Sequence, residues 1–222
     1  MNDLAFLTWV RGTGLETALS IFFLGLIWRL IEVFSLGRKK DLSLARHRSG
    51  ASGWHTMYRR SIPAAALLRT SPSVYVSYAG GYTFHIGLFI IILFFEPHIQ
   101  LFKTTLGLVW PGLPSKVVDF ITVLTLIAMI VVLVDRINKK VKRFLSTFGD
   151  YFAWTITFLP VLTGWMAVQH LVMPYTRMLA THILCVEILL IFFPFTKLLH
   201  GAATFGARWY NGNLNGHKGV QV

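Results

Sequence analysis

Five apolar stretches, each about as long as a helix that crosses a bilayer, dominate this sequence. A hydrocarbon core of about 30 Å takes roughly 20 helical residues. Stretches of this kind lie at Leu15–Phe34, Tyr82–Phe102, Val117–Val134, Phe152–Val172 and Tyr175–Leu199. Little more than Met173 and Pro174 separates the last two, so we expect them to form a tight hairpin. The sequence therefore predicts an all-α polytopic membrane bundle of five transmembrane helices.

Composition agrees with lipid as the solvent. Hydrophobic residues make up 55% of the 222 residues and charged residues 14%, and the mean hydropathy is +0.60. A soluble domain of this length would need more polar surface, and the length suits one domain, 1–222. The net charge of +12 is high, but the basic residues cluster between the apolar stretches. Membrane topology explains such clusters, so we expect no nucleic-acid partner.

The basic residues lie in alternate connections. The first connection, 35–81, has one acid, Asp41, against Arg38, Lys39, Lys40, Arg46, Arg48, Arg59, Arg60 and Arg69, and the third carries Arg136, Lys139, Lys140, Lys142 and Arg143. The second has Lys103 and Lys116 near it, and the fourth has Arg177. Because basic connections stay in the cytoplasm, we expect a multi-pass protein with its N-terminus outside and its C-terminus inside.

Two polar segments flank the bundle on the predicted cytoplasmic side. The loop 35–81 is too polar to be embedded, and two interpretations are open. It is either a solvated loop or a surface that docks a soluble partner or anionic lipid headgroups. The tail 201–222 contains several Asn and Gly residues, so we expect it to be extended or disordered unless a partner orders it.

Five of the eight histidines lie in or at the ends of the apolar stretches, where ionisable side chains mark functional sites: His85, His98, His170, His182 and His200. His182 and His200 are 18 residues apart, five helical turns and about 27 Å, so they share one face of a helix. His85 and His98 are separated by about 20 Å on the same basis. The second and fifth stretches run in opposite directions, so His85 is level with His200 near the inside and His98 with His182 near the outside.

Two imidazoles at one depth are what a six-coordinate haem iron needs, one on each side. A flat, apolar porphyrin fills the gap between helices of a bundle, and we expect Gly87 to give it room. The sequence thus indicates two haem groups, one held by His85 and His200 and one by His98 and His182. His170 is a rival partner for His182, and the alternative is a set of isolated, hydrogen-bonded histidines.

The single cysteine, Cys185, restricts the cofactors of this chain. It excludes an internal disulfide, a cysteine-ligated zinc site, an iron–sulfur cluster within the chain and the Cys-x-x-Cys-His attachment of a c-type haem. An iron–sulfur partner must therefore be another subunit. The sequence also lacks a nucleophile triad, a metal-hydrolase motif and a phosphate-binding loop, so we expect no catalysis by this chain alone.

The residues Phe84-His85-Ile86-Gly87, together with His182 and His200 on the last of five helices, resemble the gamma-subunit (cytochrome b) family of respiratory nitrate reductase. That family includes membrane cytochromes of heterodisulfide-reductase-like and sulfate-reducer transmembrane complexes. The resemblance covers roughly Ala18 to His200. It implies two b-type haems, electron exchange with quinone near the outer haem, and a cytoplasmic iron–sulfur or catalytic subunit near the inner haem.

Residue by residue, the resemblance assigns His85 and His200 to the inner haem and His182 to the outer haem. In the nitrate reductases the other outer ligand lies ten residues after the first histidine, where this chain has Phe95. His98 is the nearest substitute. This departure favours the related transmembrane redox complexes over a true nitrate reductase.

Other polar residues are candidates for quinone or proton chemistry. Glu187 lies in mid-membrane and either relays protons, pairs with a cation or is a structural acid. Glu96, Lys103 and Asp119 lie near the predicted outer surface, where quinone head groups bind in the resembling family. Two other functions are open: a haem-free transporter or channel, which predicts helices broken by Gly or Pro in two matching halves, and a structural anchor.

Overall fold

The computed structural model describes residues 2–37, 44, 51–59 and 72–220, and in these ranges it contains helices and connections but no strand. Five helical spans are long and apolar enough to cross a bilayer, which confirms the predicted all-α five-span bundle: Asp3–Ser35, Pro72–Phe94, Ser115–Asn138, Phe148–Val168 and Tyr175–Phe195. The predicted bounds of the basic loop 35–81 are wrong at its end, because residues 72–81 belong to the second span. Arg38, Arg46, Arg60 and Arg69 of this loop lie outside the described residues.

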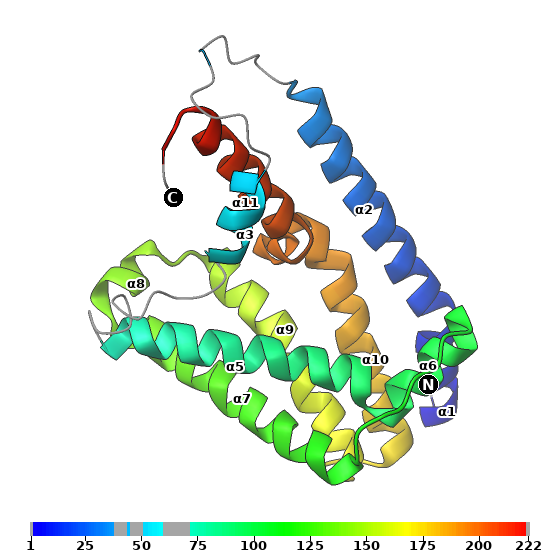
Figure 1. Ribbon diagram of the computed structural model, residues 1–222. Coiled ribbons are helices and arrows are strands. Elements are labelled where there is room, and N and C mark those ends of the chain that lie inside the picture. Colours follow the sequence, from blue (N-terminus) through cyan, green and yellow to red (C-terminus); the bar gives the residue numbers. More distant parts are fainter. Residues whose placement is uncertain (1, 38–43, 45–50, 60–71, 221–222) are drawn as a thin grey trace.

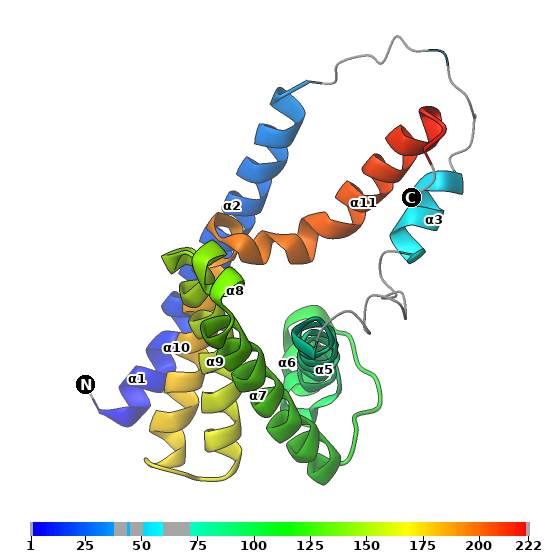
Figure 2. The same ribbon diagram turned by 90° about the vertical axis from the view of Figure 1, so that its left-hand side faces the viewer.

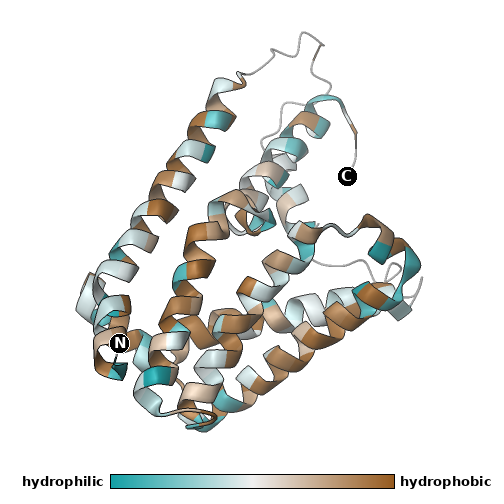
Figure 3. Ribbon diagram, turned by 180° about the vertical axis from the view of Figure 1, so that it is seen from behind, coloured by the Kyte–Doolittle hydropathy of each residue, from teal (hydrophilic) through white to brown (hydrophobic). Residues whose placement is uncertain are grey.

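The two ends of the bundle collect different connections. Figures 1 and 2 show the N-terminus, α6 and the turn between α9 and α10 toward one end, and the end of α2, α8, α11 and α3 toward the other. The residues described from the predicted cytoplasmic connections thus share one end, as expected when successive spans alternate in direction. Apolar residues run along the spans, and hydrophilic residues are most frequent toward their ends (Figure 3).

The first span is broken. It consists of α1 (Asp3–Trp9), a π-helical turn η1 (Val10–Gly14) and α2 (Leu15–Ser35). Gly12 interrupts the helix with φ −105° and ψ −105°. The helical segment therefore begins twelve residues before the predicted boundary at Leu15, with Asn2 accepting a hydrogen bond from the Ala5 amide as its cap.

The first span lies beside α10 (Tyr175–Phe192), and the two run in the same direction. Arg177 pairs with Asp3 at the beginning of both, with an N···O distance of 2.6 Å. Farther along, a Cβ on Gly14 would lie 2.8 Å from the Glu187 carboxylate, and one on Gly25 would lie 2.7 Å from the Pro194 ring. Small residues therefore let the two helices approach closely, as in other membrane bundles.

A second close pair consists of α5 (Pro72–Phe94) and α7 (Ser115–Asn138), which lie side by side and antiparallel (Figure 1). A Cβ on Gly87 would overlap the Thr125 hydroxyl of α7, and Gly80 faces Val132 in the same way. We expected Gly87 to leave room for a porphyrin, and this expectation was wrong. Gly87 instead lets α5 pack against α7.

The predicted second helix, Tyr82–Phe102, is in fact two helices. α5 ends at Phe94, Phe95 is extended (φ −82°, ψ 125°), and α6 (Glu96–Leu106) starts a new direction with Pro97 in its first turn. Proline lacks an amide hydrogen and clashes with the preceding turn, but it suits the first turn of a helix. Pro97 is the sequence signal for this break, although the stretch as a whole is apolar enough to suggest one helix.

The fourth span, α9 (Phe148–Val168), begins with a capping box in which Thr147 and Asp150 bond reciprocally. A short helix, α8 (Lys140–Leu145), precedes it. The turn from α9 into α10 contains His170 and Val172, both with positive φ, and confirms the predicted hairpin. The core between α5, α7 and α9 is built from large apolar side chains: Leu126, Met129 and Val161, surrounded by Phe84, Leu88, Ile91, Trp154, Phe158, Leu162 and Trp165.

The predicted fifth helix, Tyr175–Leu199, also breaks. After α10 come a 3₁₀ turn (Phe193–Phe195), an extended Thr196 (φ −118°, ψ 179°), a second 3₁₀ turn (Lys197–Leu199) and then α11 (His200–His217). Arg29 donates from Nε to the Pro194 carbonyl at this break (3.0 Å). Whole helical turns therefore do not separate His182 from His200, because Pro194 and Thr196 interrupt the helix.

The prediction of an extended or disordered tail is wrong for residues 201–217, which are helical. α11 packs against α3 (Ala51–Arg59) through small and polar residues. Ser52 donates to the Gly212 carbonyl (2.8 Å), and the Gly53 amide donates to Asn213 Oδ1 (3.2 Å). The ordering partner is therefore a segment of the same chain, which the composition of the tail did not reveal.

Gly87→Ala tests the packing of α5 on α7. The added methyl overlaps Thr125, so we expect a loss of about 1–3 kcal/mol in the free energy of unfolding, measured by denaturation in mixed micelles. Gly81→Ala is the matched control, because a Cβ at Gly81 meets nothing within 4 Å. Equal effects of the two substitutions would contradict the close contact at Gly87.

Candidate functional site

His85 and His200 lie against each other at the end of the bundle that carries the basic connections. Their ring centroids are 6.0 Å apart, and the ring planes are nearly perpendicular at 83°. His85 projects from α5, and His200 is the first residue of α11. The break at Thr196 sets the position of His200, since it is no longer part of the α10 helix.

His98 and His182 form a second pair toward the opposite end. Their ring centroids are 6.3 Å apart, and the planes are nearly parallel at 22°. In one unbroken helix, the His98 side chain would be rotated by roughly 220° around the helix axis from that of His85, so the two would lie on different faces. The break at Phe95 changes its direction and brings its ring to His182 of α10. Burial lowers the pKa of His98, which favours the neutral ring.

All four paired histidines use the same ring nitrogen for a backbone contact. Nδ1 lies 2.7 Å from the Gly81 carbonyl in His85, 2.8 Å from the Ile91 carbonyl in His98, 2.9 Å from the Pro160 carbonyl in His182 and 2.7 Å from the Lys197 carbonyl in His200. A carbonyl only accepts, so each Nδ1 carries the hydrogen. Each neutral ring therefore keeps the Nε2 lone pair for a ligand role, and metal-binding histidines show this same second contact.

The spacing within each pair suits an iron ion held by two imidazoles. With metal–nitrogen distances of about 2 Å, the centres of two opposed rings are separated by roughly 6 Å. The observed separations are 6.0 and 6.3 Å. In the described part of the chain, no three or more His, Cys, Asp or Glu side chains gather in a metal-binding group, so pairs of histidines are the ligand sets that it offers.

The helices that carry these pairs have other packing partners. α5 packs mainly on α7, and α10 packs mainly on α9 and α2. The histidines therefore meet across helices whose main contacts lie elsewhere. On α5, Phe89 is one turn beyond His85 and 58% exposed, and Ile92 is 40% exposed. An apolar macrocycle held by His85 would meet apolar side chains on this face.

The position of His182 depends on α9, which the sequence did not indicate. A Cβ on Gly164 would lie 2.9 Å from His182 Cε1, so only glycine leaves space for the ring at this contact. Pro160, one turn earlier, provides the carbonyl that accepts from Nδ1. A Pro and a Gly four residues apart within an apolar span were the signal available in the sequence.

An ion pair supports the position of His200. Lys197 Nζ lies 2.8 Å from both carboxylate oxygens of Asp150, and the Lys197 carbonyl accepts from His200 Nδ1. Arg136 is 3.6 Å from the same carboxylate. The first turn of α9 therefore holds the segment that presents His200. The sequence showed these charges but not their pairing, because Asp150 and Lys197 are 47 residues apart.

The remaining candidates are distributed differently. His170 is exposed in the α9–α10 turn, and its ring lies 5.4 Å from that of Tyr175; it is His98 that lies against His182. Glu96 is exposed and accepts from Gln100, and Lys103 is exposed in the last turn of α6. Asp119 accepts from Trp165 Nε1 (2.9 Å) and Gln169 (2.7 Å), so it links α7 to α9.

Glu187 is buried, with 3% of its surface exposed, and its Oε1 has no hydrogen-bond partner among the described residues. It faces Gly14 at the end of the π-helical turn in the first span. The cation partner that the sequence suggested is not observed within the described ranges. A carboxyl group buried without a partner is costly, and π-helical turns occur frequently at functional sites.

A protein of Nitratidesulfovibrio vulgaris, whose name gives no function, is 35% identical to this chain over 127 residues. The match covers 57% of this chain and 56% of that protein, so the chain spans about half the length of this relative. No family model matches the sequence. No solved structure matches it either.

Gly164→Ala should displace the His182 ring, because the added methyl would lie only 2.9 Å from Cε1. In ligand-free protein labelled with ¹⁵N-histidine, we expect the Nδ1–H tautomer for all four paired rings and a changed signal for His182 in the variant. Gly149→Ala, in the same helix, is the control, since its Cβ meets only Thr147 at an ordinary 3.7 Å. An unchanged His182 signal would contradict the contact.

Proposed function

We propose that this chain is a di-haem b-type membrane cytochrome that transfers electrons between a quinone pool and a partner on the cytoplasmic side. One observation carries the proposal. All four histidines that form two cross-helix pairs donate Nδ1–H to a backbone carbonyl. A structural histidine also makes such a contact, but here the contact occurs in all four members of two cross-helix pairs, and ligand histidines need it to fix the ring and its tautomer.

The inner pair, His85 and His200, and the outer pair, His98 and His182, are the proposed axial ligands. The single cysteine, Cys185, leaves no Cys-x-x-Cys-His attachment, so the haems are of the non-covalent b type. When bound, each haem takes up and releases one electron at its iron. The protein contributes ring orientation and apolar surroundings, and both adjust the potential of such a group.

The proposed partner is a cytoplasmic iron–sulfur or catalytic subunit of a respiratory-type complex. The inner pair lies at the end of the bundle where α3 and α11 pack together, and His200 is the first residue of α11. This end also carries the basic connections that the charge pattern assigns to the cytoplasm. A partner that docks on α11 therefore reaches the inner pair by the shortest route. A prokaryotic inner membrane is the proposed location.

The proposed quinone region lies by the outer pair, on α6. His98 is on this helix, together with Glu96 and Lys103 as exposed polar groups and Leu101, which is 50% exposed. Quinol oxidation releases two protons along with two electrons. Carboxyl groups that take up protons are therefore needed near this end of the bundle.

Glu187 is the proposed proton-accepting group. Its Oε1 has no partner in the part of the chain that the structure describes, and an unpaired carboxylate in an apolar surrounding is much less stable than the neutral acid. Such a group takes up a proton readily and releases it when a path to water opens. Gly14 beside it and Gly12 at the break of the first span give the backbone freedom to open.

A reduced-minus-oxidised spectrum of the purified protein tests the haem assignment. We expect a b-type α-band near ~560 nm, the usual signature of bis-histidine ligation. His85→Ala and His200→Ala should each remove the same haem, and His98→Ala and His182→Ala should each remove the other. His170→Ala is the control and should keep both. Absence of the band from protein supplied with haem would end the proposal.

Glu187→Gln tests the proton role. The amide cannot take up a proton, so we expect proton release coupled to quinol oxidation to slow by about tenfold or more, with the haem spectrum unchanged. Glu16→Gln is the control, because Glu16 is an exposed carboxylate in the same part of the first span. Unchanged proton release in Glu187→Gln would exclude the relay and leave a structural acid.

A haem-free ion transporter is a second candidate, and one observation favours it. The first span breaks at Gly12, two residues before Gly14 meets Glu187, a carboxyl whose Oε1 has no partner among the described residues. Broken helices beside ionisable groups are typical of transporters. The four identical histidine contacts favour the cytochrome instead. The same spectrum separates the two functions, because a transporter of this kind has no α-band.

A further inference from the structure

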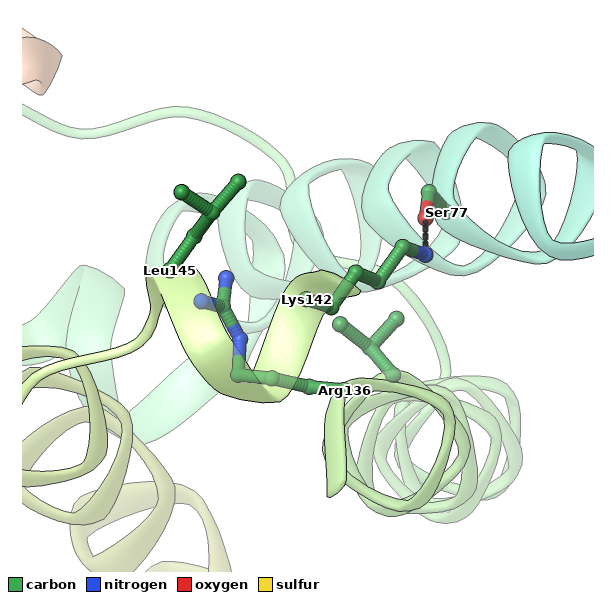
Figure 4. Close-up of a pocket in the computed structure, with 5 residues that line it drawn as sticks. Ser77, Arg136, Lys142 and Leu145 are labelled. Atoms are coloured by element: carbon green, nitrogen blue, oxygen red, sulfur yellow. Dashed lines mark hydrogen bonds between the residues drawn. The ribbon is translucent and has the colours of Figure 1, made fainter. Parts of the chain in front are cut away.

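A pocket of about 210 Å³ lies where α5, α7 and α8 meet, at the end of the bundle with the basic connections (Figure 4). Two of its lining residues are cationic and two are apolar: Arg136, Lys142, Val132 and Leu145, with Ser77 completing the wall. None of them belongs to the histidine pairs or to the proposed proton site. The pocket is therefore separate from both proposed sites.

Lys142 is held in place as part of the wall. Its ammonium group donates to Ser77 Oγ, as Figure 4 shows, and to the Ser73 carbonyl (3.2 Å), and it pairs with Asp135. These three contacts use its three donors. Lys142 thus ties α8 to α5 and α7, and Asp135 balances its charge.

Arg136 retains donors for a ligand. Its Nη1 donates to Ser146 Oγ (3.0 Å) and lies 3.6 Å from Asp150. Within the described part of the chain, its Nε and Nη2 groups have no acceptor. Lys197 lies closer to Asp150, at 2.8 Å, so that carboxylate is shared. Arg136 therefore carries positive charge that its neighbours only partly balance.

The surrounding segment adds to this positive charge. Residues 135–150 contain five cations against two carboxylates: Arg136, Lys139, Lys140, Lys142 and Arg143 against Asp135 and Asp150. Both carboxylates are already paired within the protein. An anion at the pocket would meet a net attraction, and a free guanidinium edge binds phosphate oxygens in two-point geometry.

Strongly exposed apolar side chains lie on α8 and at the start of α9, and one of them, Leu145, lines the pocket. Their exposed fractions lie between 69% and 88%: Val141, Phe144, Leu145 and Phe148. In water such a cluster would be costly, but at a membrane surface apolar side chains enter the acyl region while neighbouring lysines and arginines stay at the headgroups. The pocket thus lies at headgroup depth, with an apolar edge beside it.

We propose that this pocket is a binding site for the phosphate headgroup of an anionic phospholipid. Arg136 donates to the phosphate oxygens, and Leu145 contacts the first methylene groups of the acyl chains. Lys142 and its three partners keep the walls in place. The apolar edge is what distinguishes a lipid from a free anion, and basic pockets between membrane helices are known to favour such headgroups.

Thermal stability of the full-length protein in a neutral detergent tests this site. Phosphatidylglycerol should raise the melting temperature with a saturable dependence on its concentration, because a ligand of the folded state stabilises it. Phosphatidylcholine and inorganic phosphate should not. Arg136→Gln should weaken the phosphatidylglycerol effect by about tenfold or more, since charged hydrogen bonds are lost.

Arg143→Gln is the matched control, because it removes the same charge from an exposed position on α8 that does not line the pocket. It should leave lipid binding within about twofold. Leu145→Glu is a second test that keeps Arg136 and changes an exposed residue, so folding is preserved. Repulsion at the mouth should weaken binding, and Leu145→Gln should do so less.

Two outcomes would overturn the proposal. Equal losses in Arg136→Gln and Arg143→Gln would show diffuse attraction to a basic surface instead of a site. An equal rise in melting temperature with inorganic phosphate would show that the pocket takes free anions.

Discussion

The structure depends on the need to satisfy backbone polar groups where no water can reach them. An unbroken helix does this by itself, but in the described residues the helical backbone breaks at Gly12, Phe95 and Thr196. At the break after α5, the Leu93 carbonyl accepts from Trp110 Nε1 and the Phe94 carbonyl accepts from the Leu113 amide. The breaks can therefore occur within a membrane bundle, because nearby groups provide the missing hydrogen bonds.

The proposed haem ligands use the same carbonyl chemistry. His98 bonds to Ile91 in the last turn of α5, and His200 bonds to Lys197 in the turn between α10 and α11. Each contact satisfies a second lone pair of a carbonyl and also fixes which nitrogen of the ring remains free. The breaks thus contribute to the proposed site twice, by redirecting the histidine and by providing an acceptor for it.

Glycine has two distinct uses in this bundle. Gly80 and Gly87 let α5 pack against α7, and Gly14 and Gly25 let the first span pack against α10. Gly164 instead leaves space for an imidazole of a neighbouring helix. Sequence alone does not separate the two uses, because every one of these residues lies in an apolar span. The expectation for Gly87 failed for this reason: its face of α5 is turned to α7.

The sequence by itself determined the five spans and predicted that His85 pairs with His200, because both depend on apolar length and on depth in a bilayer. It left His98 and His170 open as the partner of His182, and the structure brings His98 there. It did not determine the breaks at Phe95 and Thr196 or the helix 200–217. Hydropathy gives the length of an apolar stretch but not the direction of the chain within it. The helix 200–217 packs against α3, more than 140 residues earlier in the chain, so no local pattern predicts it. Only the tertiary structure showed the shared use of Nδ1, the unpartnered Glu187 and the pocket at Arg136. Each of these depends on contacts between helices that are distant in sequence, which no local pattern encodes.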